Sequence, residues 1–302
     1  MKKTNSEKNK HPKISVVIIT KDRRSELREC LTSLVVQTVA PDEVIIVDSS
    51  VSFAIKKLVQ KFQKRSRFPI RYWANQSHSY GALRNFGIKN TKHSWVAFID
   101  DDCVAELEWF STMKKVVKSS QAEVYLGLSQ TYFQNNLPSL VTSFLDTYWK
   151  RRRIDANYSI TDFEITDTKN LLVSKTFLTK NNISFHEDLS YGGKGEDCLL
   201  GVDLEGAGGT GRFLPSMKVL HKDPITWKQY YLKLYQEVFA YRTNVQNYKK
   251  RKIPNNPQLR KVNFTMFFKE WIETYKLNFL ERISFGFNIF LTVILIKITK
   301  FF

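Results

Sequence analysis

Short apolar runs alternate with amphipathic stretches along the first third of the chain. The apolar runs are rich in Val and Ile, which is typical of strands buried on both faces of a sheet. They occupy residues 14–19, 43–47, 70–73 and 95–99. Between them, apolar residues recur at helical spacing over 25–36, 54–62 and 80–88. This alternation predicts an α/β fold with a mostly parallel sheet flanked by helices.

The regular alternation stops after residue 102. Further helices are predicted over 109–117, 137–149 and 196–205, and further strands over 123–128 and 212–220. We expect a disordered basic tail over 1–12, one α/β domain over 13–225 and a helical, basic extension over 226–302.

Composition narrows the class of protein. The 302 residues are 42% hydrophobic and 14% aromatic, enough for a packed core, which excludes a disordered or fibrous chain. The three cysteines, Cys30, Cys103 and Cys198, lie too far apart for a zinc knuckle or a dense disulfide framework. Such cysteine usage favours a reducing, cytoplasmic setting.

Positive charge is concentrated near the C-terminus. The net charge is +18, and residues 228–302 contribute 14 Lys and Arg against 4 Asp and Glu. The same region contains an uncharged apolar run over 283–296, shorter than the ~20 residues that span a bilayer. We therefore expect peripheral attachment to the anionic inner face of the cell membrane; the alternative is a helix packed on the domain.

Three consecutive carboxylates, Asp100, Asp101 and Asp102, directly follow the apolar run 95–99. Alternate side chains of an extended chain share a face, so Asp100 and Asp102 are predicted to lie close together. A divalent cation would offset their repulsion, and oxygen ligands suit Mg²⁺ or Mn²⁺. The alternative is a solvated acidic turn that caps the next helix. The buried strand beneath the triplet favours the metal.

Two other predicted strands end in polar side chains, Thr20 and Asp48. Ligands of open α/β sheets bind at the carboxyl ends of the strands, so these residues are candidates for a binding site. Arg84 and Asn85, on the predicted helix 80–88, could face the same edge of the sheet. The alternative for Arg84 is an ordinary surface ion pair.

The second half of the chain adds three candidates. Glu196 and Asp197 follow a glycine-rich segment over 192–195, and His221 follows the predicted strand 212–220. Two acidic residues in a first helical turn can also simply complement the helix dipole, and His221 can be a surface residue. The G-x-G-x-x-G string over 206–211 follows a helix and precedes a strand, the reverse of a dinucleotide site, and therefore predicts a turn.

Together these motifs resemble the family 2 glycosyltransferases, which have the GT-A fold. The resemblance covers roughly 13–222 and rests on the segments 15–20, 44–48, 84–85, 100–102 and 195–197. It implies an inverting transfer in which Thr20 and Asp48 contact the nucleotide base, Arg84 lies near the donor and residues 100–102 hold a metal on the diphosphate. The family signature is often Val-Asp-Asp-Gly-Ser, whereas Ser49 and Ser50 follow Asp48 here, which leaves the donor base open.

On this basis we predict a metal-dependent glycosyltransferase that moves a sugar from a nucleotide-diphosphate donor, a UDP-sugar, to a glycan or lipid-linked acceptor. Asp197 is the predicted general base. Mn²⁺ or Mg²⁺ is the predicted cofactor, held by Asp100, Asp102 and His221. The predicted substrate-binding residues are Thr20, Asp48, Arg84, Asn85, Asp100, Asp101 and Glu196. The chain lacks the Gln-x-x-Arg-Trp motif of processive synthases, so a single addition is expected.

Two other classes compete with this interpretation. The net charge suits a basic nucleic-acid-binding module, but no nucleic-acid motif is present, and the aspartate cluster would repel phosphates without a metal. A phosphatase or nucleotidyltransferase on a similar sheet is the other class. A phosphatase would need an aspartate nucleophile after the first strand, where Thr20 stands and Asp22 follows two residues later.

Overall fold

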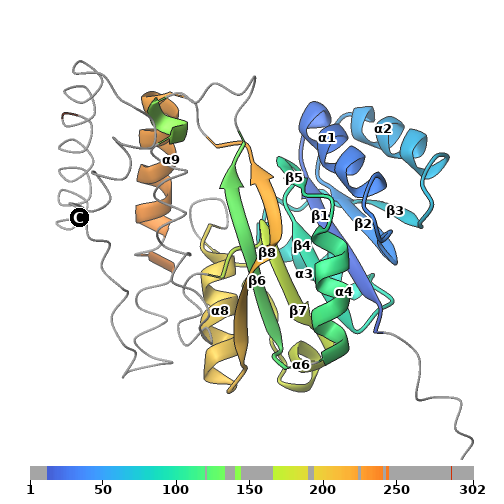
Figure 1. The fold of residues 1–302 in the computed structure, drawn as a ribbon. Helices are drawn as coiled ribbons and strands as arrows, with labels where there is room; N and C mark the ends of the chain where they lie inside the picture. Colours follow the sequence, from blue (N-terminus) through green and yellow to red (C-terminus); the bar gives the residue numbers. More distant parts are fainter. Residues whose placement is uncertain are drawn as a thin grey trace, which may run out of the picture.

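The computed structural model describes residues 12–119, 121–132, 140–143, 166–189, 194–223, 226–240, 243–244 and 287. Its centre is an eight-stranded sheet in the order β3-β2-β1-β4-β7-β6-β8-β5, flanked by helices (Figure 1). The predicted tail and most of the predicted helix 137–149 lie outside the described residues; 140–143, the described part of that helix, are helical.

The first half of the sheet is parallel, as predicted. It contains β1 (Ile14–Thr20), β2 (Glu43–Asp48), β3 (Ile70–Ala74) and β4 (Trp95–Ile99). The connecting helices are α1 (Arg24–Val35), α2 (Ala54–Gln63) and α3 (Tyr80–Lys89). Thr20 pairs with Asp48, and Asp48 with Ala74, so the carboxyl ends of these strands are level at one rim.

The alternation of side chains along β1 shows why the strands are apolar throughout. Val16 and Ile18 belong to the core cluster that contains the buried residues of α1 and α2, such as Leu31. Val17 belongs to the opposite cluster, together with Leu83 of α3. Both faces of the parallel half are therefore buried under helices, and its rim is left as the place where polar groups gather.

The second half of the sheet has mixed directions. Antiparallel pairs join β7 (Asn170–Ser174) to β4 and to β6 (Val124–Thr131), and β5 (Cys103–Ala105) to β8 (Gly211–His221), while β6 and β8 run parallel. Helices α4 (Trp109–Ser119), α6 (Lys175–Lys180), α8 (Glu196–Gly206) and α9 (Trp227–Ala240) complete the described elements. The glycine string ends α8 and leads into β8, as the predicted turn requires.

Asn170 locks the irregular pairing of β6 with β8. The register shifts after Gly127, where β8 has extra residues that leave carbonyl groups without ladder partners. The buried Asn170 amide donates to the carbonyls of Leu128 (3.0 Å) and Met217 (2.7 Å), and its oxygen accepts from Trp109 Nε1 (2.8 Å). Beyond these hydrogen bonds, Thr131 lies opposite His221 at the ends of β6 and β8.

The structure also bears on membrane contact. Within the ranges given above, no helix is long and apolar enough to cross a bilayer. Phe287 is described within the apolar run 283–296, and it is exposed.

Candidate active site

The acidic turn after β4 is anchored to β1 by its middle residue. Thr20 Oγ1 donates to Asp101 Oδ2 (2.6 Å), and both side chains are buried. Burial and the adjacent charge of Asp102 raise the pKa of the Asp101 carboxyl to about 7. The contact places Asp101 inside the rim and leaves Asp100 and Asp102 on either side of it.

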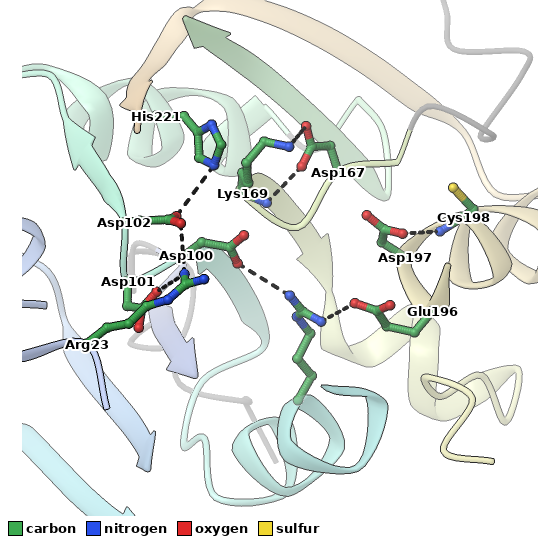
Figure 2. A network of polar contacts seen from close by, with 11 residues as sticks. Arg23, Asp100, Asp101, Asp102, Asp167, Lys169, Glu196, Asp197, Cys198 and His221 are labelled. Carbon is green, nitrogen blue, oxygen red and sulfur yellow. Dashed lines mark hydrogen bonds and ion pairs between the residues drawn. The ribbon is translucent and has the colours of Figure 1, made fainter. Parts of the chain in front are cut away.

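Asp102 faces His221, as Figure 2 shows. His221 Nε2 lies 3.6 Å from Asp102 Oδ1, a buried oxygen to which none of the described residues donates a hydrogen bond. A buried carboxylate oxygen without a donor is costly unless something positive fills its place. An imidazole nitrogen and carboxylate oxygens are the donors that Mn²⁺ accepts, so these residues fit the predicted metal.

Cys103 lies beside this pair. Its Sγ belongs to a group with Asp102 and His221 whose ligand atoms are all within 4.8 Å of one another. Complete burial and the nearby aspartates raise the pKa of the thiol well above its usual value. A neutral thiol is a poor ligand for Mg²⁺ or Mn²⁺, so Cys103 backs the site and Asp102 and His221 face it.

The His221 ring is held from behind by Asp223. His221 Nδ1 lies 2.9 Å from Asp223 Oδ1, and Thr131 Oγ1 donates to Asp223 Oδ2 (2.7 Å). Burial alone would raise the pKa of Asp223, but the His221 ring and these hydrogen bonds outweigh burial and hold the pKa well below its ordinary range. Sequence analysis missed Asp223, although the His-x-Asp spacing could have indicated it.

Arg23 covers the outer side of the acidic turn. Asp22 takes a left-handed backbone conformation (φ 56°), which Asp tolerates better than most residues, and its N–H donates to Ser50 Oγ (2.7 Å). This tight turn brings Arg23 Nη1 to 3.1 Å from Asp101 and 2.8 Å from Asp102. The Arg23 side chain stays 53% exposed, so its charge remains accessible at the rim. Sequence analysis also missed this residue.

Arg84 connects the acidic turn to the start of α8. Its Nη2 lies 3.3 Å from Asp100 Oδ1, and its Nη1 forms a buried ion pair with Glu196. Burial alone would lower the pKa of Arg84, but Glu196 and Asp100 outweigh burial and raise it. The guanidinium is thus always charged, and the alternative of an ordinary surface ion pair is wrong.

Asp197 occupies the first turn of α8, next to Glu196. The helix begins after Gly195, whose positive φ of 91° is easy only for glycine. Burial and the neighbouring charges of Glu196 and Asp167 raise the pKa of the Asp197 carboxyl to about 7. Its Oδ1 accepts from the N–H of Cys198 (2.8 Å). A partly exposed carboxylate with such a pKa suits a general base near neutral pH.

A cation that sequence analysis did not identify lies between these two ends of the site. Lys169, just before β7, pairs with Asp167 (2.9 Å), and Figure 2 places the pair between His221 and Asp197. Nothing in the local sequence distinguishes Lys169 from a surface lysine, because its place depends on how β7 joins the sheet.

Asp48 and Asn85 are already engaged within the protein. Asp48 is buried at the end of β2, where its oxygens accept from Tyr72 Oη (2.7 Å) and from the Ser50 N–H (2.8 Å). The Asn85 amide donates to Phe185 O (2.8 Å) and Glu187 Oε1 (2.7 Å) and accepts from the Phe185 N–H (2.9 Å). Asn85 therefore fastens the segment that contains Phe185 and Glu187 to α3.

Comparison with known proteins gives the same picture. The model of the glycosyl transferase family 2 matches residues 15–174. A chondroitin synthase from Pasteurella multocida (strain Pm70) is 24% identical over 247 residues, which are 72% of this chain and 25% of the relative. The chain thus spans about a quarter of the length of that relative.

Solved structures share the fold at low sequence identity. S. aureus TarS 1-349 in complex with UDP-GlcNAc matches with a TM-score of 0.54 and 16% identity, over 80% of this chain and 69% of that one. The mannosyltransferase PcManGT from Pyrobaculum calidifontis, in complex with GDP-Man and Mn²⁺, matches with a TM-score of 0.60 and 12% identity, over 87% and 70%.

A parallel half-sheet whose rim carries an acidic turn, joined to a mixed half, is the GT-A fold that these solved structures share. The family model covers more than half of the sequence, and the chain belongs to glycosyl transferase family 2. Membership of this family favours glycosyl transfer over the phosphatase and nucleic-acid-binding classes.

Proposed function

We propose that this chain transfers a single sugar from a UDP-sugar to a glycan or lipid-linked acceptor, with inversion at the anomeric carbon and with Mn²⁺ or Mg²⁺ as cofactor. One observation carries the proposal. The buried, donor-free oxygen of Asp102 faces His221 Nε2 at 3.6 Å, which is a place suited to a cation at the end of the sheet where GT-A donors bind.

At the donor end, Asp102 and His221 would hold the metal together with Asp100. The bound cation supplies Lewis-acid neutralisation of the diphosphate leaving group. Arg23 adds a second positive charge from an exposed position beside the same carboxylates. Together these charges would stabilise the diphosphate as it departs with the electron pair of the broken glycosidic bond.

The nucleoside would lie at the carboxyl ends of β1 and β2, near Thr20 and Asp48. The Asp48 carboxylate can accept a hydrogen bond from an N–H of the base, and uracil offers one. Tyr72 and the Ser50 N–H already fix the direction of this carboxylate, so it would meet the base without rearranging. The UDP-GlcNAc complex of TarS supports a UDP-sugar, and the GDP-Man complex of PcManGT is a case in which this fold binds another base.

At the acceptor end, Asp197 would remove the proton from the attacking hydroxyl as the new bond to the anomeric carbon forms. One base and one displacement from the face opposite the leaving group invert the configuration. Arg84 supports this step indirectly, because its ion pair with Glu196 fixes the first turn of α8 from which Asp197 projects. Glu196 is the substitute base if Asp197 is not used.

We further propose that the C-terminal extension holds the enzyme on an anionic membrane and brings it to a lipid-linked acceptor. The excess of positive charge in 228–302, the uncharged run 283–296 and the exposure of Phe287 support this placement. Salt should weaken such attachment, because electrostatic attraction to the surface is screened.

A screen of nucleotide sugars tests the proposed function. Release of the nucleoside diphosphate is measured for UDP- and GDP-sugars with Mn²⁺, with Mg²⁺ and with EDTA. We expect turnover of a UDP-sugar that stops on chelation and returns when the metal is added back. Equal turnover in EDTA would contradict the metal dependence, and turnover of GDP-sugars alone would contradict the proposed donor.

A further inference from the structure

Asp223 is a buried carboxylate to which the proposed transfer step gives no role. Its side chain is 5% exposed, and it lies two residues beyond the end of β8. One oxygen accepts from Thr131 Oγ1 (2.7 Å) at the end of β6, and the other lies 2.9 Å from His221 Nδ1. Both oxygens are thus engaged. One contacts His221 itself, and the other contacts Thr131, which lies opposite His221 in the pairing of β6 with β8.

The backbone of His221 is fixed independently of the Asp223 side chain. The His221 carbonyl accepts from the N–H groups of Tyr132 (2.8 Å) and Asp223 (3.1 Å), and His221 pairs with Cys103 of β5 and Thr131 of β6. These contacts determine where the Cα atom lies. They leave the rotation of the ring open, and the hydrogen bond to Asp223 determines it.

The same hydrogen bond determines which ring nitrogen is free. A carboxylate only accepts hydrogen bonds, so the contact with Asp223 favours the imidazole tautomer that has its proton on Nδ1 and its lone pair on Nε2. Nε2 is the nitrogen 3.6 Å from the donor-free Asp102 oxygen. A carboxylate behind a metal-binding histidine also makes the imidazole a stronger electron-pair donor.

We propose that Asp223, supported by Thr131, is a positioning residue of the metal site that presents His221 Nε2 to the cation. Asp223 does not touch the cation or the substrate. This inference rests on the proposed metal-dependent function. Partners of this kind typically contribute 10- to 100-fold to metal affinity.

The informative variant is Asp223→Asn, which keeps the size of the side chain. Its amide can donate to Nδ1, and this contact places the ring proton on Nε2, pointing at Asp102. If Asp223 only stabilised the fold, Asp223→Asn would lower the melting temperature and would not change the tautomer of His221. Metal affinity and the nitrogen coupling of bound Mn²⁺ separate the two roles.

The experiment titrates the full-length protein with Mn²⁺ alone and follows free Mn²⁺ by EPR. We expect Asp223→Asn to bind Mn²⁺ about 10- to 100-fold more weakly than the wild type. Pulsed EPR should show ¹⁴N coupling from one imidazole in the wild type and weak or no coupling in Asp223→Asn, as in His221→Ala. Asp188→Asn, the same change at an exposed position, is the matched control and should bind as the wild type does.

Thr131→Val keeps the Asp223–His221 contact and removes only the supporting hydroxyl, so we expect a several-fold loss of affinity with the ¹⁴N coupling retained. This variant decides the question if Asp223→Asn does not fold. Wild-type affinity and coupling in folded Asp223→Asn, or wild-type affinity in Thr131→Val when Asp223→Asn does not fold, would overturn the role of Asp223 alone. Absence of Mn²⁺ binding by the wild-type protein would overturn the metal-dependent function as well.

Discussion

Arg84 and Glu196, 112 residues apart in the sequence, form a buried ion pair that joins α3 to the first turn of α8. Arg84 also reaches Asp100, so a single guanidinium touches both the acidic turn and the helix that carries the proposed base. Arg84 therefore links the metal end of the proposed site to the end that carries the proposed base.

Replacing Arg84 should destabilise the fold. Arg84→Met leaves the buried Glu196 without a counter-charge, and losing one partner of a buried ion pair costs about 3–5 kcal/mol. We expect this loss in the free energy of unfolding, measured in urea. Arg84→Lys retains the charge but not the two-point contact, and should lose less stability while still lowering the transfer rate. Wild-type stability of Arg84→Met would contradict the buried pair.

Asp197 should control the pH dependence of transfer. The base must be unprotonated, and its pKa is about 7, so the transfer rate should rise with pH through 7 and level off above it. Asp197→Asn should lose about 10²–10⁴ in rate and keep its affinity for UDP. Asp203→Asn, the same change on the same helix, is the control and should retain the rate. Full activity of Asp197→Asn would move the role to Glu196.

The raised pKa of Asp197 also affects stability. The folded state binds this proton more strongly than the unfolded state, whose carboxyl has a pKa near 3.8. The stabilising contribution of this group is therefore complete below that value and is lost as the pH rises through 7. Melting curves should show that Asp197→Asn loses less stability than the wild type between pH 5 and 8.

Substitutions of the adjacent residues Asp102 and Cys103 should affect Mn²⁺-dependent UDP binding differently. Asp102→Asn should abolish the Mn²⁺-dependent part of UDP binding in calorimetry, because the oxygen that faces His221 loses its charge. Cys103→Ala should keep that part, since the thiol is neutral in the fold. Metal-dependent binding that is lost in Cys103→Ala, while the variant remains folded, would make Cys103 a ligand.

Tyr72 should affect the nucleoside end without affecting the metal. Tyr72→Phe removes the hydrogen bond to Asp48 (2.7 Å), worth about 1 kcal/mol, and should weaken UDP binding several-fold to a similar degree with Mn²⁺ and with EDTA. Asp48→Ala should weaken it further. A loss seen only with Mn²⁺ would place these residues at the diphosphate instead.

Asn170 should be intolerant of substitution by apolar residues. Asn170→Leu leaves the Trp109 Nε1–H and the carbonyls of Leu128 and Met217 without partners, at about 1–3 kcal/mol for each buried group. We expect a loss of more than about 3 kcal/mol in the free energy of unfolding. Asn181→Leu, at an exposed position, is the control and should change stability little.

The parallel half of the fold was predictable from sequence because its strands are buried on both faces. The runs 14–19, 43–47, 70–73 and 95–99 lie within one residue of β1 to β4. Strand β5 was missed because three residues show no period. The antiparallel place of β7 was missed because strand direction depends on the path of the chain, which local pattern does not record.

The site was predictable where residues follow strands. Asp102 and His221 were both expected near a metal, and the structure brings them together. Arg23 was missed because its partners Asp101 and Asp102 are distant in sequence, and Asp223 because it lies behind the His221 ring. Lys169 was missed because its place depends on how β7 joins the sheet. A motif identifies side chains that project from a strand end. It does not identify the side chains that orient them or balance their charge.

Among the described strands, β5 pairs only with β8, and Cys103 lies opposite His221 in that pairing. Asp102 and His221 thus become neighbours only after a segment from the middle of the domain has docked with one from its C-terminal end, an event with a loop-closure entropy cost. A nascent chain could complete its parallel half long before residue 221 is synthesised, yet it would have no place for the cation. A cation that binds only the finished arrangement would then stabilise the docked state of the last strands to assemble.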